Sequence, residues 1–346
     1  MGRAERVGLI KQLEKERGSH LVSYITSTRS NREVQMAMDS VRKIYDHLRA
    51  IDKPKKDVKV DLFLHSNGGD GTVPWRLVTL IREFASKFSV LVPFKAFSAA
   101  TLTALGANEI VMHPMGMLGP TDPTVTNPFN PPDPKDPSKL IGISVEDVTA
   151  YIALVKEDAG IQHEDELIQA FRLLAERVHP LALGNVKRSL SQSRMMAKKL
   201  LALHMGKSDD HKIEEIVDSL TSKLFFHGHP INRREAKDQV GLGAVAVPSL
   251  NVEKTMWALY EQYEKEMDME EPFVPVLEFL DQFPGTLPAT GETTPEKTSR
   301  LAFIESVSHA DIFRQAYQIK GSPNPAGGIQ TAVLVTKSGW VKENSN

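Results

Sequence analysis

The chain contains no cysteine among its 346 residues. This absence excludes a thiol nucleophile, disulfide bonds, and zinc or iron–sulfur sites built on thiolates. Any nucleophile in this chain is therefore something other than a thiol. The absence of cysteine also fits a reducing compartment, so we expect a cytoplasmic protein.

Long apolar runs are missing as well. No stretch of about 18 consecutive apolar residues occurs, and residues 1–20 hold no apolar segment of signal-peptide length. We therefore predict no membrane span. Positive charge is not in excess either, because 42 Lys and Arg face 44 Asp and Glu, which gives a formal net charge of −2. This balance argues against nucleic acid as the main partner.

Short apolar segments alternate with helical patterns near the start of the chain. The Leu62-Phe63-Leu64 run indicates a strand buried on both faces. Strands and helices that alternate over short links predict an α/β fold with a largely parallel sheet. The predicted strands are 20–26, 58–65, 89–94 and 109–113, and the predicted helices are 32–50, 72–87 and 98–106.

The later part of the chain is less regular. Residues 119–139 contain seven prolines, which exclude regular structure there. This segment is either a surface linker or a loop that covers a site or an oligomer contact. Asn232 is predicted to cap a helix. Further helices are predicted at 144–158, 163–178, 184–204, 209–224 and 252–268, and strands at 244–247, within 300–319 and at 331–335.

Two stretches about thirty residues apart carry the chemistry. Gly68 and Gly69 follow a predicted strand, and glycines there let backbone N–H groups face a ligand, because no Cβ blocks close approach. Ser98 lies among small residues (AFSAAT) where a strand gives way to a helix. Backbone donors for an oxyanion, together with a positioned hydroxyl, form the core of a serine acyl-transfer site.

These stretches and the segment EIVMHPMGMLGPTDP at 109–123 resemble the Clp protease/crotonase superfamily. Within it, the chain is most similar to the serine dehydrogenase proteinase family, which is related to signal peptide peptidase A. The resemblance covers about residues 20–250. It implies an α/β superhelix of β-β-α units with a largely parallel sheet. We therefore expect a lead-in at 1–19, a peptidase domain at 20–250, and a C-terminal extension of unassigned role at 251–346.

The resemblance also implies roles for individual residues. Ser98 matches the nucleophile, Gly68 and Gly69 match the glycines that offer oxyanion N–H groups, and Ala99 can add another. Asp122 matches the orienting carboxylate and His227 the general base, so that the chain order is Ser, Asp, His. Members of the superfamily usually assemble into rings or smaller oligomers, which implies a homo-oligomer.

Reasoning from the residues leaves the base open. His229 and His179 are alternatives to His227, and a lysine of the predicted 184–204 helix is another. The lysine alternative follows the Ser/Lys pair of signal peptide peptidases, in which desolvation lowers the pKa of the lysine. His65 and His113 end strands near the site and are more typical of pocket lining.

The main hypothesis is a serine peptidase that hydrolyses peptides or proteins through an acyl-enzyme on Ser98. One alternative is a crotonase-like acyl-CoA enzyme, which would use the paired N–H groups to stabilise an enolate. The other is a non-catalytic, oligomeric binding module. Nothing in the sequence calls for a metal or an organic cofactor.

Overall fold

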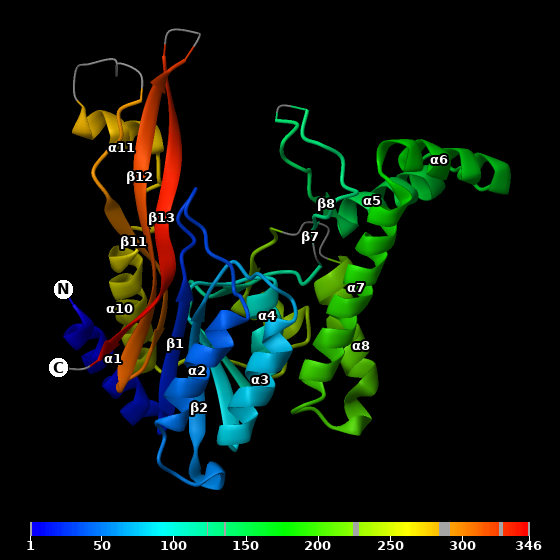
Figure 1. Ribbon diagram of the computed structural model, residues 1–346. Helices are drawn as coiled ribbons and strands as arrows, with labels where there is room; N and C mark the ends of the chain where they lie inside the picture. Colours follow the sequence, from blue (N-terminus) through cyan, green and yellow to red (C-terminus); the bar gives the residue numbers. More distant parts are fainter. Residues whose placement is uncertain are drawn as a thin grey trace.

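A mixed eight-stranded sheet lies between two layers of helices (Figure 1). The computed structural model describes residues 2–122, 124–134, 136–223, 228–283, 291–324 and 328–344. The strands follow the order β10-β5-β3-β2-β1-β11-β12-β13. Their bounds are β1 His20–Thr26, β2 Lys59–His65, β3 Lys87–Val92, β5 Glu109–Met112, β10 Val245–Ala246, β11 Lys297–Glu305, β12 His309–Pro323 and β13 Ile329–Asn344.

The first part of the sheet is parallel, as predicted. Strands β10, β5, β3, β2 and β1 pair in parallel, with Val22 opposite Leu62 as one register point. The C-terminal strands continue the same sheet from β1, and each of their pairings is antiparallel. The C-terminal residues therefore extend the sheet that carries the Gly-Gly stretch. The predicted α/β class with a largely parallel sheet is confirmed.

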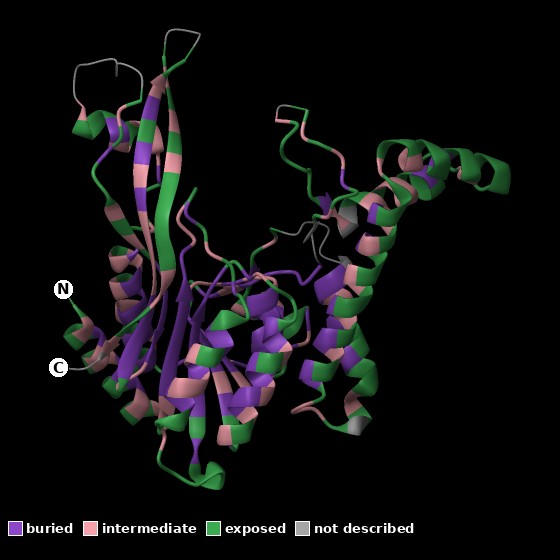
Figure 2. Cartoon of the chain, viewed as in Figure 1, coloured by how far each residue is buried: buried purple, intermediate pink, exposed green. Residues whose placement is uncertain are grey.

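Helices cover both faces of the sheet, and each face has its own apolar core. On one face lie α2 (Asp39–Arg49), α3 (Val73–Phe84) and α4 (Ala99–Leu105), and on the other lie α1 (Arg3–Arg17) and α10 (Leu250–Glu266). Figure 2 shows the buried strands between these layers.

Strand β2 shows how one segment serves both cores. Leu62 and Leu64 face the core on the α2–α4 side, whereas Phe63 faces the core on the α1 and α10 side. Successive side chains of a strand point to opposite faces, so a strand covered on both sides reads as a continuous apolar run. The predicted burial of β2 on both faces is confirmed.

The predicted helix at 32–50 is wrong in its first turns, because α2 begins only at Asp39. The backbone groups of Met36 bond to another segment and not to a helix. The Met36 N–H donates to Gly68 O at 2.8 Å, and the Met36 C=O accepts from Asp70 N at 2.9 Å. Residues before Asp39 therefore run alongside the Gly-Gly stretch. A sequence periodicity cannot show this long-range pairing.

The C-terminal strands also differ from the prediction. Instead of one strand within 300–319, the structure has β11 and β12, separated by a turn at 306–308. Strand β13 is much longer than the predicted 331–335, because it pairs along β12 over most of its length. Figure 1 shows this hairpin extending beyond the body of the sheet.

A second, three-stranded sheet lies beside the first, in the order β4-β6-β9. It joins β4 (Lys95–Ala96), β6 (Met117–Leu118) and β9 (Ile231–Asn232). Strand β4 is parallel to β6, and β9 is antiparallel to it. Asn232 caps α9 (Arg233–Asp238) as predicted, since its side chain accepts from Arg234 N at 3.0 Å.

The remaining helices form an arm and a short C-terminal element. The arm contains α5 (Val145–Ala153), α6 (Glu164–Arg177), α7 (Pro180–Leu201) and α8 (Asp210–Asp218), and α11 (Pro275–Gln282) packs on the C-terminal hairpin. The prediction that residues 119–139 hold no regular structure is wrong at one point, because Thr124–Val125 form the short strand β7, which pairs with β8 (Ile143–Ser144) just after the segment. Figure 1 shows α6 projecting away from the sheet.

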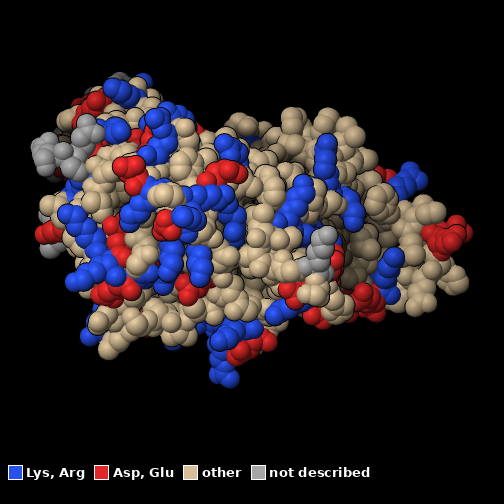
Figure 3. Space-filling model, turned by 90° about the horizontal axis from the view of Figure 1, so that it is seen from below, with Lys and Arg blue, Asp and Glu red and all other residues tan. Residues whose placement is uncertain are grey.

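Charged side chains of both signs share the surface of the folded chain (Figure 3). Figure 3 shows Lys and Arg interspersed with Asp and Glu on the face that it presents. Within the residues that the structure describes, no helix is both long enough and apolar enough to cross a bilayer.

Candidate active site

Ser98 has a strained backbone. It lies between β4 and α4 with φ 51° and ψ −114°. These angles are close to those of the first central residue of a type II′ turn, a position that glycine normally takes. Strain of this kind costs on the order of 1–3 kcal/mol and is concentrated at functional sites. The Ser98 side chain makes no capping bond to α4, so the helix does not use the hydroxyl.

Gly68 packs directly against the turn that holds Ser98. A Cβ added at Gly68 would lie 2.7 Å from Phe97 O and 2.8 Å from Ser98 Cβ, and its φ of +98° also requires glycine. Gly69 has a φ of +153°, and a Cβ there would lie 2.4 Å from Met36 O. The two glycines thus bring the first stretch into contact with the Ser98 turn on one side and with residue 36 on the other.

A residue that the sequence analysis missed, Ser66, holds this arrangement together. Its buried Oγ accepts from Gly68 N at 3.0 Å and from Thr26 Oγ1 at 2.8 Å. Its backbone N–H donates to Lys95 O at 2.9 Å, and its C=O accepts from Phe97 N at 3.0 Å. The sequence feature that could have identified Ser66 is a hydroxyl residue directly after an apolar strand and two residues before Gly68.

A cavity of 370 Å³ opens beside Ser98, and we call it the Ser98 cavity. Four segments distant in sequence line it. They are the loop 69–72, the first turns of α4 with Ser98, Ala99 and Leu102, and a polar face of α7 with Ser189, Gln192 and Ser193, together with Thr121. Hydroxyl and amide side chains lie beside apolar surface in this lining, a mixture that suits a ligand such as a peptide.

Asp122 is fully buried next to this cavity. Its neighbour Thr121 lines the cavity and is fixed by two contacts, from Thr121 N to Leu220 O at 2.9 Å and from Ser193 Oγ to Thr121 O at 2.5 Å. The aspartate therefore sits on a segment tied to α7 and held close to the Ser98 turn.

The three-stranded sheet brings the predicted catalytic segments to one edge. Ala96 lies beside Leu118, and Leu118 lies opposite Ile231. Ser98 follows β4 and Asp122 follows β6. The antiparallel β9 enters the sheet at that same end, so the residues just before Ile231 lie there too. His227 precedes Ile231 in sequence, but it is outside the described residues, so its own position is not assigned.

Four of the five alternative bases have defined partners. His229 Nε2 lies 2.6 Å from Glu235 Oε1. His179 caps α7 and stacks on Phe129 with ring centroids 5.0 Å apart. Lys198 forms an ion pair with Glu214, and Lys199 lies over the Trp75 ring. Lys187 is exposed.

The two strand-end histidines have structural surroundings. His65 is fully buried, and its Nδ1 accepts from Lys95 N at 3.2 Å. Burial, reinforced by the charge of Lys95, lowers the pKa of His65 to about 3. A base must accept a proton near neutral pH, and a ring with that pKa does so poorly. His113 stacks on Trp257 with ring centroids 5.0 Å apart.

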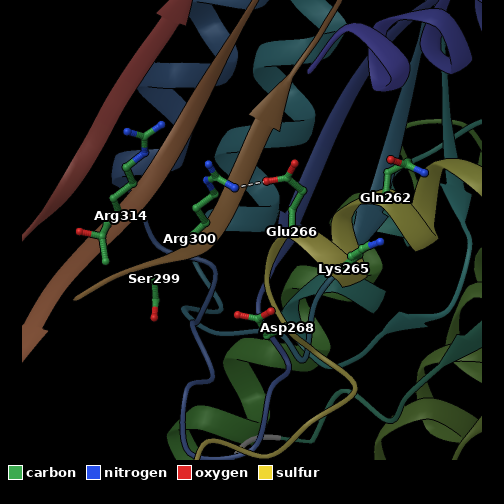
Figure 4. A pocket seen from close by; sticks show the side chains of 8 residues that line it. Gln262, Lys265, Glu266, Asp268, Ser299, Arg300 and Arg314 are labelled. Atoms are coloured by element: carbon green, nitrogen blue, oxygen red, sulfur yellow. Dashed lines mark hydrogen bonds and ion pairs between the residues drawn. The ribbon is translucent and has the colours of Figure 1, made fainter. Parts of the chain in front are cut away.

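A larger cavity of 550 Å³ lies elsewhere, between the end of α10 and strands β11 and β12 (Figure 4). Charged side chains line it, and two of its arginines form ion pairs. Arg300 forms an ion pair with Glu266, and Arg314 forms one with Glu343. Ser98, Gly68 and Gly69 do not line this cavity. We therefore do not take it as the candidate active site, although it is larger than the Ser98 cavity.

The chain is similar in sequence to two archaeal proteins. Two uncharacterized proteins of Methanocaldococcus jannaschii, MJ1495 and MJ0137, are each 24% identical to the chain, over 266 and 263 residues. These alignments cover 76% and 75% of this chain, and 78% and 79% of the relatives.

Two solved structures are also similar. Both are mutants of the 1510-N membrane-bound stomatin-specific protease, and the second is in complex with a substrate peptide. Each superimposes with a TM-score of 0.26, at 17% and 14% identity. The matches cover 40% and 70% of this chain, and 62% and 99% of theirs.

A match to a family model shows which protein family the chain belongs to. The model of the ClpP-like SDH-type serine proteinases matches residues 2–178, just over half of the chain. The matched region includes the Gly-Gly stretch, Ser98 and Asp122, and it ends before residue 227. The chain therefore belongs to the ClpP-like SDH-type serine proteinase family, and it is a serine-type peptidase with a ClpP-like α/β fold.

Proposed function

We propose that Ser98 is the nucleophile that hydrolyses peptide bonds in the Ser98 cavity. Its Oγ attacks the peptide carbonyl carbon while a base takes the hydroxyl proton. The tetrahedral intermediate then collapses, the C–N bond breaks, and the same base returns the proton to the leaving amine. Water repeats the sequence on the ester and releases Ser98. The single observation that carries this proposal is the strained Ser98 turn packed against Gly68.

The backbone N–H groups of Gly69 and Ala99 are our proposed oxyanion donors. Both residues line the Ser98 cavity, and Ala99 begins α4 directly after the nucleophile. Gly68 was also predicted to be a donor, but its N–H donates to Ser66 Oγ in this structure. We therefore propose a different role for Gly68: because it has no Cβ, the Ser98 turn can pack directly against it. Donors of this kind act on the charge that develops in the transition state.

A fluorophosphonate probe tests the nucleophile in the native protein. It should modify Ser98, and peptide mapping by mass spectrometry should find the adduct there. Ser189 is the matched control, because it is a second serine that lines the same cavity. A Ser189→Ala variant should still be labelled at Ser98, whereas Ser98→Ala should not be labelled. Modification of Ser189 in place of Ser98 would contradict the proposal.

His227 remains our proposed general base, oriented by Asp122. The three-stranded sheet supports this role, because it brings the segments that carry Ser98 and Asp122, and the start of β9, to one edge. His229 is the described alternative, already paired with Glu235. Removal of a general base leaves the serine hydroxyl without a proton acceptor.

Separate alanine variants of the two histidines should distinguish them. We expect His227→Ala to lower kcat by about 10³-fold or more, with KM little changed. His229→Ala should lower kcat by less than about tenfold, because its bond to Glu235 fixes the loop before α9 and not the nucleophile. The opposite ranking would transfer the role of base to His229.

We also propose that copies of this chain assemble through α6. Ile168, Phe171 and Leu173 on this helix are 64%, 52% and 62% exposed. Within the chain, α6 mainly contacts the adjoining π-helical turn Leu154–Asp158. A projecting helix with exposed apolar side chains is typical of a protein–protein contact, and a second copy is always available as the partner.

Sedimentation velocity measures this assembly. The wild-type chain should sediment as an oligomer. The Ile168→Glu/Phe171→Glu double variant should shift toward the monomer, because two exposed apolar side chains that the proposed interface buries become charged. Arg172→Glu is the control, since it adds a negative charge to the same helix without removing an apolar side chain. An oligomer that resists the double variant would place the interface elsewhere.

A further inference from the structure

Two histidines and an aspartate from opposite ends of the chain meet in a buried cluster. His47 lies in α2, whereas His309 and Asp311 lie in β12. All three are buried, with exposed fractions of 2%, 6% and 1%. No other group of three such side chains with ligand spacing occurs in the part of the chain that the structure describes. None of the three lines the Ser98 cavity.

The potential ligand atoms of the cluster converge. His47 Nε2 lies 3.5 Å from Asp311 Oδ2, and His309 Nε2 lies 3.4 Å from the same oxygen. The two imidazole rings stack with centroids 3.8 Å apart and planes 9° apart, and both Nε2 atoms lie near Asp311 Oδ2. Because the lone pair of an imidazole nitrogen lies in the plane of its ring, one of the two rings must turn for both to bind the same ion. The ligand atoms of the three residues lie within 4.8 Å of one another.

These separations suit a metal ion better than a direct hydrogen bond. An N–H···O bond is usually about 2.9–3.0 Å long, and neither Nε2 atom makes a hydrogen bond among the described residues. Zinc bonds to nitrogen and carboxylate oxygen are about 2.0–2.2 Å, which gives ligand-to-ligand edges of about 3.3–3.5 Å in a tetrahedron. Two buried Nε2 atoms thus lie at ligand-to-ligand distance from one carboxylate oxygen.

The surroundings orient the three ligands. His47 Nδ1 lies 2.8 Å from Ser306 Oγ, and His309 Nδ1 lies 2.8 Å from Ser308 Oγ. When each serine oxygen accepts from Nδ1–H, the Nε2 atom carries the lone pair that a metal needs. The Lys43 ammonium lies 3.1 Å from Asp311 Oδ1, which leaves Oδ2 facing the histidines.

We propose that His47, His309 and Asp311 bind a divalent transition metal ion, with zinc as the first candidate. Two imidazoles and one carboxylate are a ligand set that suits zinc, and water completes a tetrahedral site. The bound ion fastens α2, in the peptidase core, to β12, in the C-terminal strands. Its role is structural, because neither the strained Ser98 turn nor the Ser98 cavity contains a ligand.

Zinc titration of the full-length protein, after chelator treatment and dialysis, tests the site. We expect one zinc ion per chain by elemental analysis. We also expect a rise in Tm of about 4 °C at a zinc concentration a hundredfold above Kd. Cobalt in place of zinc should give the visible absorption of a tetrahedral ion. Ser98→Ala should bind zinc as the wild type does, which separates this proposal from the proposed peptidase mechanism.

Glutamine variants locate the bound ion. His47→Gln and His309→Gln should each weaken zinc binding by at least about a hundredfold and abolish the Tm rise. His113→Gln is the matched control, because His113 is 8% exposed and stacks on Trp257, outside the cluster. Equal zinc binding by wild type and His309→Gln would overturn the proposal. If the variants fail to fold, absence of zinc binding or of a tetrahedral cobalt spectrum in the wild type would overturn it.

Discussion

Ser98→Ala is expected to lower kcat/KM for peptide hydrolysis by on the order of 10⁴–10⁶-fold. The hydroxyl is the only part of the site that forms a bond to the substrate in the proposed mechanism. The oxyanion donors and the cavity remain in the variant, so a small residual rate and nearly unchanged peptide binding should persist. Steady-state kinetics with a fluorogenic peptide, together with a binding titration, measure both quantities.

The matched control for this variant is Ser191→Ala. Ser191 is an exposed serine on α7 whose Oγ bonds to Lys187 O, and it does not line the Ser98 cavity. Its loss should leave kcat/KM unchanged. Hydrolysis that survives in Ser98→Ala at the wild-type rate would exclude Ser98 as the nucleophile, even though the chain belongs to a peptidase family.

Ser98→Gly should separate strain from chemistry. It should be as inactive as Ser98→Ala, but its free energy of unfolding should be higher than that of Ser98→Ala by about 1 kcal/mol. The reason is that glycine takes a φ of 51° without a Cβ clash. Denaturant melts of the two inactive variants give this difference. It would show that the wild-type chain keeps a strained residue at the position of the nucleophile.

Gly68→Ala should lower both activity and stability. The new methyl group would lie 2.7 Å from Phe97 O and 2.8 Å from Ser98 Cβ, at a φ of +98°. We expect the free energy of unfolding to fall by about 2–4 kcal/mol, from backbone strain and overpacking. We expect kcat/KM to fall roughly a hundredfold or more, because a displaced Ser98 turn misplaces the nucleophile by a large fraction of an ångström.

Gly71→Ala is the control for Gly68→Ala. Gly71 belongs to the same loop, but its φ is outside the left-handed region and a Cβ there meets no atom within 4 Å. The free energy of unfolding of the Gly71→Ala variant should therefore stay within about 0.5 kcal/mol of the wild-type value. Equal stability of the Gly68 and Gly71 variants would mean that the Gly68 contact with the Ser98 turn is not close in solution.

The order of elements was predictable because it depends on local patterns. The strands at 20–26, 58–65 and 109–113 and the helix at 98–106 agree with the structure to within one or two residues. The Gly-Gly stretch was also identifiable from the sequence, because a close approach of two backbone segments requires glycine. Ser98 was identifiable because small residues surround it where a strand gives way to a helix. Local propensity could not place the start of α2, since the pairing of Met36 with the Gly-Gly stretch is a long-range contact.

Other features required the folded chain. Ser66 looks like any strand-end serine until its bonds to Gly68 and Thr26 are seen. The C-terminal strands carry no motif, yet β11 pairs with β1 and completes the main sheet. His47, His309 and Asp311 have no ligand spacing in the sequence, because two ends of the chain supply them.

Residue types and short spacings were enough to predict the α/β pattern, to exclude thiol chemistry and to locate the candidate nucleophile about thirty residues after two glycines. Each of these depends on residue type and short spacing, which act within a few residues of chain. Which distant segments meet is visible only in the folded chain. The strained turn of Ser98 against Gly68, the α7 wall of the Ser98 cavity and the buried histidine–aspartate cluster all arise from packing across the sheet. Such contacts depend on how layers close in space, and no local preference encodes them.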